Sequence, residues 1–226
     1  PIDISISLTN TDENPIAWYI DKPEIKPVVF GDWIGKVSEG KSSTNFNNIF
    51  FNPHGHGTHT ECAGHISLEH LSVNKFLREF WFEAQLISVQ PKKQKNEADG
   101  IIDEVVTLDQ IRQLGEIKSE ALIVRTLPNP IVKQSIVYSG TNPPYFEAEI
   151  ADYLVKQGVK HLLVDLPSVD REVDGGVLDF HHRFWQYPAN PRMDSTITEL
   201  IYVPENVKDG RYYLNLQVAP FDNDAA

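Results

Sequence analysis

The chain has a single cysteine, no long apolar run and no excess of basic residues. Cys62 cannot form an internal disulfide, so nothing in the sequence indicates an oxidising compartment. No stretch approaches the roughly 20 apolar residues of a membrane span. No signal peptide is evident, although the start at Pro1 is compatible with a leader that has been removed. We therefore expect a cytoplasmic protein that has no membrane partner.

The charge balance excludes another class of partner. There are 20 Lys and Arg residues against 32 Asp and Glu residues, a formal net charge of −12, so no basic stripe is available to neutralise nucleic-acid phosphates. At 226 residues the chain is long enough to bury one substantial core. We find no internal repeat and no boundary, and we expect one domain over residues 1–226.

Histidine is concentrated in one place. Five of the eight histidines lie between residues 54 and 70, and four of these fall within the twelve-residue stretch HGHGTHTECAGH, which begins at His54. Imidazole is the commonest protein ligand for a catalytic divalent metal, and Glu61 adds a carboxylate. Interspersed glycines allow the backbone to bend tightly around an ion. The alternative is a polar loop with solvated imidazoles, but the clustering favours a metal site.

Spacing suggests which side chains act together. In an extended segment His59 and Glu61 point to the same side, and so does His65, four residues beyond Glu61. Two downstream candidates are the pair His181-His182 and Glu199, which stands among apolar and β-branched residues where an unpaired carboxylate is costly to bury. An ion pair of Glu199 with Arg183 or Arg192 is the alternative interpretation.

The hydrophobic pattern predicts a mixed α/β protein. A run of apolar residues at 121–124, a helical pattern ending at Gly158 and a second apolar run at 161–165 form a βαβ unit with parallel pairing. A capping box at Thr107 begins a short helix that Gly115 ends. The remaining expected elements are strands at 2–8, 80–89, 199–203 and 212–218, an aromatic-rich loop at 9–48, and a helix beginning at Pro143-Pro144.

These residues resemble a known family. The stretch Gly57–His65 is similar to the signature H-x-G-T-H-x-D-x-P-x-H of the cyclase family of metal-dependent hydrolases, which includes bacterial kynurenine formamidases and isatin hydrolases. The strand at 121–126, the segment from Gly158 to Asp170 and the His182–Glu199 pair resemble further family segments. The resemblance covers nearly the whole chain and implies a single-domain swivelling β/β/α fold with a mixed sheet.

Carried over by position, the resemblance implies a metal site. His59, Glu61, His182 and Glu199 would be ligands of zinc or manganese, as one or two ions, and His65 would be the catalytic acid/base. The first signature histidine falls on Gly55, so His54 or His56 must replace it; we prefer His54, which follows Pro53. Glutamate also replaces the bridging aspartate, and Ala63 replaces the usual proline. The chain therefore resembles a divergent branch.

The resemblance implies hydrolysis of an amide C–N bond, in an aryl formamide such as N-formylkynurenine or in a cyclic amide. A divalent ion activates water and polarises a carbonyl, while His65 would pass a proton to the leaving nitrogen. Trp18, Trp33 and Phe51 are candidate walls for a flat aromatic substrate, although each could equally be core. The family also implies a homodimer or a larger homo-oligomer.

Two other functions remain open. His54, His56 and Glu61 fit the metal spacing of cupins, in which two histidines and a glutamate hold iron for oxygen chemistry. The alternating glycines and the βαβ pattern argue against that jelly-roll fold. The displaced first histidine also allows a metal- or small-molecule-binding protein of the same fold without catalysis.

Overall fold

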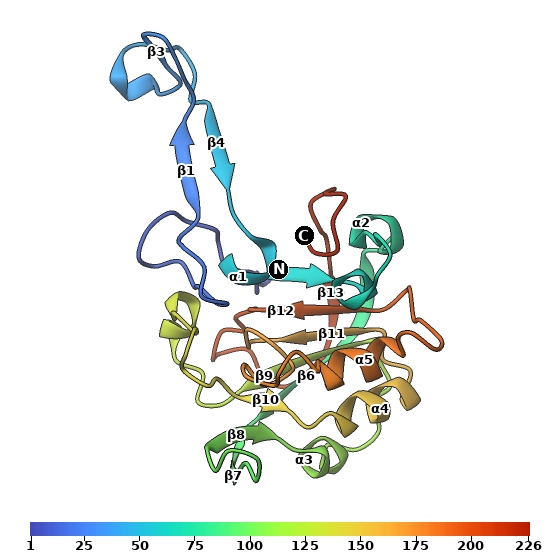
Figure 1. Cartoon of the computed structure of the whole chain (residues 1–226). Helices are drawn as coiled ribbons and strands as arrows, with labels where there is room; N and C mark the ends of the chain where they lie inside the picture. Colours follow the sequence, from blue (N-terminus) through green and yellow to red (C-terminus); the bar gives the residue numbers. More distant parts are fainter.

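The computed structural model describes residues 1–226, and its main feature is a six-stranded mixed sheet from which a long hairpin arm projects (Figure 1). The strand order is β13-β6-β9-β11-β12-β5; the four inner strands are parallel, and each edge strand is antiparallel to its neighbour. A smaller sheet has the order β10-β8-β7.

The strands are β1 Glu24–Pro27, β2 Val29–Phe30, β3 Trp33–Ile34, β4 Asn47–Phe50, β5 His59–Glu61, β6 Trp81–Val89, β7 Lys92–Lys95, β8 Ile102–Val106, β9 Ala121–Thr126, β10 Tyr145–Phe146, β11 His161–Val164, β12 Thr196–Glu199 and β13 Gly210–Asn215. The α-helices are α1 Pro53–His56, α2 Val73–Phe76, α3 Leu108–Gln113, α4 Glu149–Lys156 and α5 Asp179–Trp185, and three 3₁₀ turns cover Val37–Glu39, Ala63–Ile66 and Ile131–Ser135.

The centre of the sheet follows the sequence pattern. β9 and β11 are buried throughout, which explains their continuous apolar runs, and α4 connects them in parallel register. The expected strand at 80–89 is β6, and α3 begins at the expected capping box, where the Thr107 N–H donates to the Gln110 side chain. The predicted βαβ unit is therefore confirmed.

Three of the five α-helices, α3, α4 and α5, cover one face of the sheet (Figure 1). The larger core lies between that face and helices α3, α4 and α5, and it includes Ile111, Leu154 and Trp185. The second core covers the opposite face with the short helix α2 and with irregular segments around residues 201–207. Helix α5 can therefore supply side chains to the sheet edge from the face that it covers.

Some predicted boundaries are wrong. Residues 3–8 alternate in burial as expected, with Ile2 exposed, but residues 2–8 form no strand. They are anchored mainly by two hydrogen bonds, from the Tyr202 N–H to the Ile4 carbonyl and from the Ile6 N–H to Thr58 Oγ1. α4 begins at Glu149 rather than at Pro143, because Tyr145 and Phe146 pair with β8 as β10. At the C-terminal end, β12 ends at Glu199, where the strand expected at 199–203 would begin, and β13 overlaps the strand expected at 212–218 over residues 212–215.

The segment expected to be a loop at 9–48 contains the arm. β1 pairs with β4, β2 pairs with β3, and Trp33 packs on Phe46 with ring centroids 6.3 Å apart. The arm exposes Phe30 at 83% and Phe50 at 74%. None of the helices is both long and apolar enough to cross a bilayer.

Candidate metal centre

The outer edge of the central sheet brings three buried side chains together. β5 pairs with β12 so that His59 lies opposite Glu199 and Glu61 lies opposite Ile197. Since side chains two residues apart share a face of a strand, His59, Glu61 and Glu199 all point toward the α5 side. Each is at most 3% exposed. The two carboxylates and the imidazole are therefore buried together at one point of the sheet edge.

His59 has the tautomer of a metal ligand. Its Nδ1 lies 2.9 Å from the Gly57 carbonyl, which can only accept, so Nδ1 carries the proton and Nε2 keeps its lone pair. Nε2 is buried without a hydrogen-bond partner, 3.5 Å from Glu199 Oε2, and Glu61 Oε2 is also buried and unpartnered. Buried polar atoms are rarely left unpaired, so these two atoms mark a place for a cation.

The downstream histidine is His181, one residue before the expected His182. His181 Nε2 lies 3.0 Å from Glu61 Oε1, and its Nδ1 is bonded to Asp170. The His182 ring instead points to the Tyr187 carbonyl, with Nδ1 3.1 Å from that oxygen. Consecutive helical residues point about 100° apart, so only one of the pair can face the sheet edge. The expected ligand His182 is thus replaced by His181.

The choice between His54 and His56 is also decided by contacts. His56 Nδ1 accepts from the Asn52 N–H at 2.9 Å, and its Nε2 donates to the Asp21 carbonyl at 2.7 Å, so neither nitrogen is free for a metal. His54 Nδ1 lies 3.1 Å from Glu61 Oε2. The structure therefore brings His54 to the cluster and leaves His56 outside it, in agreement with the preference for His54.

His65 and Asp224 complete the rim of the cluster. His65 Nδ1 lies 3.8 Å from Glu61 Oε2 and 3.4 Å from Asp224 Oδ2, and its side chain is 29% exposed. Asp224 Oδ2 lies 2.8 Å from His54 Nε2. The buried side chains thus form the floor, whereas His54, His65 and Asp224 form the open side. The sequence analysis did not single out Asp224; it named His181 only as part of the His181-His182 pair and gave the ligand role to His182, and Asp170 appeared only as the end of a segment that resembles the family.

Electrostatics tie these groups together. Burial by itself lowers the pKa of His54, but the hydrogen bond to Asp224 and the negative charges of Glu61 and Asp224 raise it to about 10. Burial opposes ionisation of Glu61, yet the charge of His65 and the bond from His181 bring the pKa of Glu61 well below its usual value. Burial also opposes the charging of His181, but Asp170 and Glu61 hold its pKa well above the ordinary value. A metal would have to displace these protons.

The residues present fit a divalent ion. Two sets of donor atoms each lie within 4.8 Å of one another, one from His54, Glu61 and His65 and the other from His59, Glu61 and Glu199. Glu61 belongs to both sets, which suits a carboxylate bridging two positions. Imidazole nitrogens mixed with carboxylates are the donors that zinc and manganese accept.

The proposed aromatic walls have different locations. The Trp18 indole donates to the His54 carbonyl at 3.2 Å, and Phe51 packs on Phe221 with centroids 5.9 Å apart, so both lie near the segment that carries His54. Trp33 lies on the arm, remote from the cluster (Figure 1). The structure therefore brings two of the three expected aromatics to the neighbourhood of the site.

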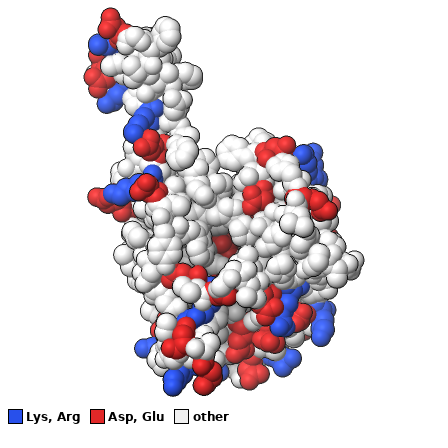
Figure 2. Space-filling view, in the orientation of Figure 1, with Lys and Arg blue, Asp and Glu red and all other residues white.

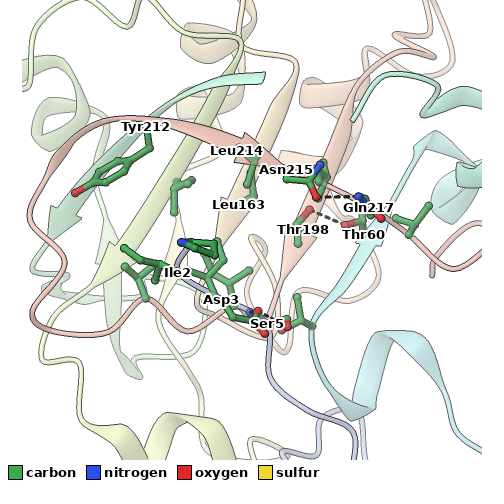
Figure 3. A pocket seen from close by; sticks show the side chains of 18 of the residues that line it. Ile2, Asp3, Ser5, Thr60, Leu163, Thr198, Tyr212, Leu214, Asn215 and Gln217 are labelled. Carbon is green, nitrogen blue, oxygen red and sulfur yellow. Dashed lines mark hydrogen bonds between the residues drawn. The ribbon is translucent and has the colours of Figure 1, made fainter. Parts of the chain in front are cut away.

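A separate cavity lies on the other face of the sheet. It has a volume of about 890 Å³, and 16 of its 25 lining residues are hydrophobic. Thr60 and Thr198, which point away from Glu61 and Glu199, face it together with Leu163 and the N-terminal residues Ile2 and Asp3 (Figure 3). It thus opens mainly on the other face of the sheet from the metal-ligand cluster, and its lining is mostly apolar, with Asp3 and His59 among its few ionisable side chains.

Comparison with known proteins identifies the family. The family model described as "Putative cyclase" matches residues 2–171, about three quarters of the chain. This protein belongs to the cyclase family. The match includes the segment from His54 to His65 and ends one residue after Asp170, so α5, Glu199 and Asp224 lie beyond it.

Solved structures agree with the cyclase fold. An isatin hydrolase bound to the product analogue thioisatinate superposes with a TM-score of 0.68 at 15% identity, covering 100% of this chain and 88% of the other. Isatin hydrolase A from Labrenzia aggregata gives 0.65 at 12% identity, with coverages of 99% and 90%. A "predicted metal-dependent hydrolase" from Bacillus stearothermophilus gives 0.66 at 15% identity, with coverages of 100% and 93%. No functionally curated protein matches.

The fold also excludes the alternative that the chain is a cupin-like iron oxygenase. A cupin is a jelly roll of antiparallel strands, whereas the central sheet here has four parallel strands with helices on one face. His56, which the cupin spacing requires, lies outside the cluster. The iron-oxygenase interpretation of the sequence is therefore wrong.

Proposed function

We propose that this cyclase-family protein is a metal-dependent hydrolase of an amide C–N bond, in an aryl formamide or a cyclic amide. One observation carries the proposal: His59 Nε2 and Glu61 Oε2 are buried and unpartnered, facing a cluster of imidazoles and carboxylates. Zinc or manganese, as one or two ions, is the cofactor that suits these donors. When bound, such an ion would polarise a carbonyl and activate water.

Buried and exposed residues of the site have different proposed roles. His59, Glu61, His181 and Glu199 would hold the metal from the closed floor of the site, and His54 would join them from the rim. Asp170 fixes the ring of His181 through Nδ1, which leaves Nε2 directed at the cluster. A rigid buried floor keeps the ligand geometry constant while the rim receives the substrate.

His65 is the candidate acid/base. Its side chain is 29% exposed, so a substrate at the open side can reach it, and it lies next to Glu61 without belonging to the buried floor. An imidazole can take a proton from water and return it to a leaving nitrogen near neutral pH. Trp18 and Phe51 border the segment that carries His54, where a flat aromatic substrate would lie against them.

The test combines metal content with turnover. The full chain, loaded with zinc or manganese, is assayed against N-formylkynurenine, isatin and simple lactams, before and after chelation. Hydrolysis that disappears with the chelator and returns with metal supports the proposal. Full metal occupancy without turnover of any of them would favour the non-catalytic binding protein instead, while failure to bind either metal would refute the metallohydrolase.

We also propose that two copies associate through the arm. Phe30, Phe46, Ile49 and Phe50 are each more than half exposed on it, which is a large amount of exposed apolar surface for one segment. Figure 2 shows much of the arm surface uncharged on the face drawn, with Lys and Arg interleaved with Asp and Glu and forming no extended basic patch. Light scattering should give twice the mass of 25.6 kDa, and Phe30→Ser with Phe50→Ser should reduce it to that of one chain.

A further inference from the structure

The last residues of the chain form part of the sheet edge. The Cys62 N–H donates to the Asp224 carbonyl at 3.1 Å, and Thr60 and Ala226 exchange two backbone hydrogen bonds at 2.9 and 3.0 Å. Ala225 forms an antiparallel bridge with Glu61. This segment therefore adds to β5 on the side away from β12, and it fixes the backbone of Asp224 beside the candidate metal centre.

The Asp224 carboxylate is aimed at His54. Its Oδ2 lies 2.8 Å from His54 Nε2, and because a carboxylate only accepts, that nitrogen carries the hydrogen. The other ring nitrogen, Nδ1, then faces Glu61 Oε2 at 3.1 Å. Asp170 makes the same kind of contact with His181, whose Nδ1 is bound by Asp170 while Nε2 faces Glu61. Two imidazoles are thus held from behind by carboxylates and face the same glutamate.

The local packing makes room for this contact. A Cβ at Gly64 would lie 2.3 Å from the Leu71 carbonyl oxygen and 3.1 Å from Asp224 Cβ. A Cβ at Gly55 would lie 2.4 Å from Ile20 Cδ1. It would also lie 3.1 Å from the Ala17 carbonyl oxygen, so a side chain at position 55 would require Ile20 and the backbone at Ala17 to shift, and it is His54 that reaches the centre. A histidine that binds from position 54 needs a second contact that directs its ring toward the centre.

We propose that Asp224 is a positioning residue that orients His54 so that its Nδ1 faces the metal. The inference rests on the proposed metal site. Carboxylates that accept the second ring N–H of a metal-binding histidine fix its tautomer and orientation, and their loss typically weakens metal binding about 10–100-fold. Asp224 lies in the C-terminal segment, beyond residues 2–171 that the family model matches.

The test measures the affinity of the full chain for zinc and manganese by competition with a chromophoric chelator. Asp224→Ala should weaken binding about 10–100-fold, and Asp224→Asn, which keeps an acceptor but loses the charge, should weaken it less. The matched control is Asp222→Ala. Asp222 is two residues away and exposed, it pairs with Lys75 and His70, and its loss should leave the affinity unchanged.

A double-mutant cycle separates positioning from a general structural effect. If Asp224 acts through His54, Asp224→Ala should produce no further loss of affinity in a His54→Ala background. Additive losses, or an Asp224→Ala protein that binds metal as tightly as the wild type, would overturn the inference while leaving the metal site intact. A wild-type chain that binds neither metal would overturn both the inference and the proposed function. Thermal unfolding of each variant checks that the fold is retained.

Discussion

His181 and Glu61, 120 residues apart in the chain, meet with 3.0 Å between Nε2 and Oε1. The contact joins α5 to the edge strand β5, and it stands between two further carboxylates, because Asp170 holds the opposite side of the His181 ring and Glu199 lies 3.8 Å from Nε2. Glu61 in turn faces His54 and His65 with its second oxygen. This one pair therefore connects the buried floor of the site to its open rim.

The first prediction separates two neighbouring histidines. His181→Ala should lower zinc affinity by more than the roughly 10–100-fold that follows loss of an outer-sphere partner, since a ligand itself is removed. His182→Ala should bind zinc as the wild type does, because its ring is bonded to the Tyr187 carbonyl outside the cluster. Chelator competition on both proteins checks this. A larger loss with His182→Ala would mean that the ligand assignment is reversed.

The second prediction concerns His65. His65→Ala should reduce kcat by roughly 10²–10⁴-fold, the usual effect of losing a general acid/base. Metal content should not change, because the buried donors His59, Glu61 and Glu199 remain. Steady-state kinetics and elemental analysis on the same sample are the measurements. Loss of metal from this variant would place His65 among the ligands.

The third prediction concerns the pH dependence of stability. Burial of His161 in the sheet, where its Nδ1 meets Thr196 Oγ1 at 2.9 Å, lowers its pKa to about 4 from an ordinary 6.5. Between pH 4 and pH 6.5 the His161 ring is protonated in the unfolded chain and neutral in the folded chain. The contribution of this group to the free energy of unfolding is therefore largest above pH 6.5 and falls as the pH drops toward 4. The expected loss between pH 7 and pH 5 is about 2 kcal/mol from this group.

The measurement is urea unfolding at both pH values. His161→Gln removes the titrating group, so its free energy of unfolding should change about 2 kcal/mol less than that of the wild type over the same range. Comparing the two differences cancels the carboxylates, which titrate in both proteins. An equal change in both would show that His161 is not held neutral by the fold.

The fourth prediction concerns a buried ion pair away from the site. Lys133 Nζ lies 2.8 Å from Asp165 Oδ2, and both side chains are largely enclosed, with 11% and 0% exposure. Burial raises the pKa of Asp165, and Lys133 opposes that effect. Lys133→Met should destabilise the fold by about 3–5 kcal/mol, because it leaves a buried carboxylate unpaired.

The control for this substitution is Lys160→Met. Lys160 pairs with Glu120 and Asp194 at a side-chain exposure of 41%, and an exposed pair of this kind typically stabilises by less than about 1 kcal/mol. Chemical unfolding of both variants gives the comparison. Adding Asp165→Asn to Lys133→Met should recover part of the loss, since the unpaired charge is then removed.

The sequence by itself determined the local features. Continuous apolar runs identified β9 and β11 as buried strands, and the capping box located α3, because these patterns depend on neighbours within a few residues. The cluster of histidines beside Glu61 indicated where metal chemistry would lie. The alternation over residues 2–8 correctly gave the burial pattern of residues 3–8 but not a strand, since a period of two specifies a face and not a hydrogen-bonding partner.

Only the tertiary structure decided which side chains form the site. His56 is excluded because two backbone groups occupy its ring nitrogens, and His181 is chosen over His182 because the direction of α5 turns one ring to the sheet edge and the other away. Asp224 reaches His54 across 170 residues of sequence. Contacts of this kind depend on strand register and helix orientation, which long-range packing sets and no local pattern encodes.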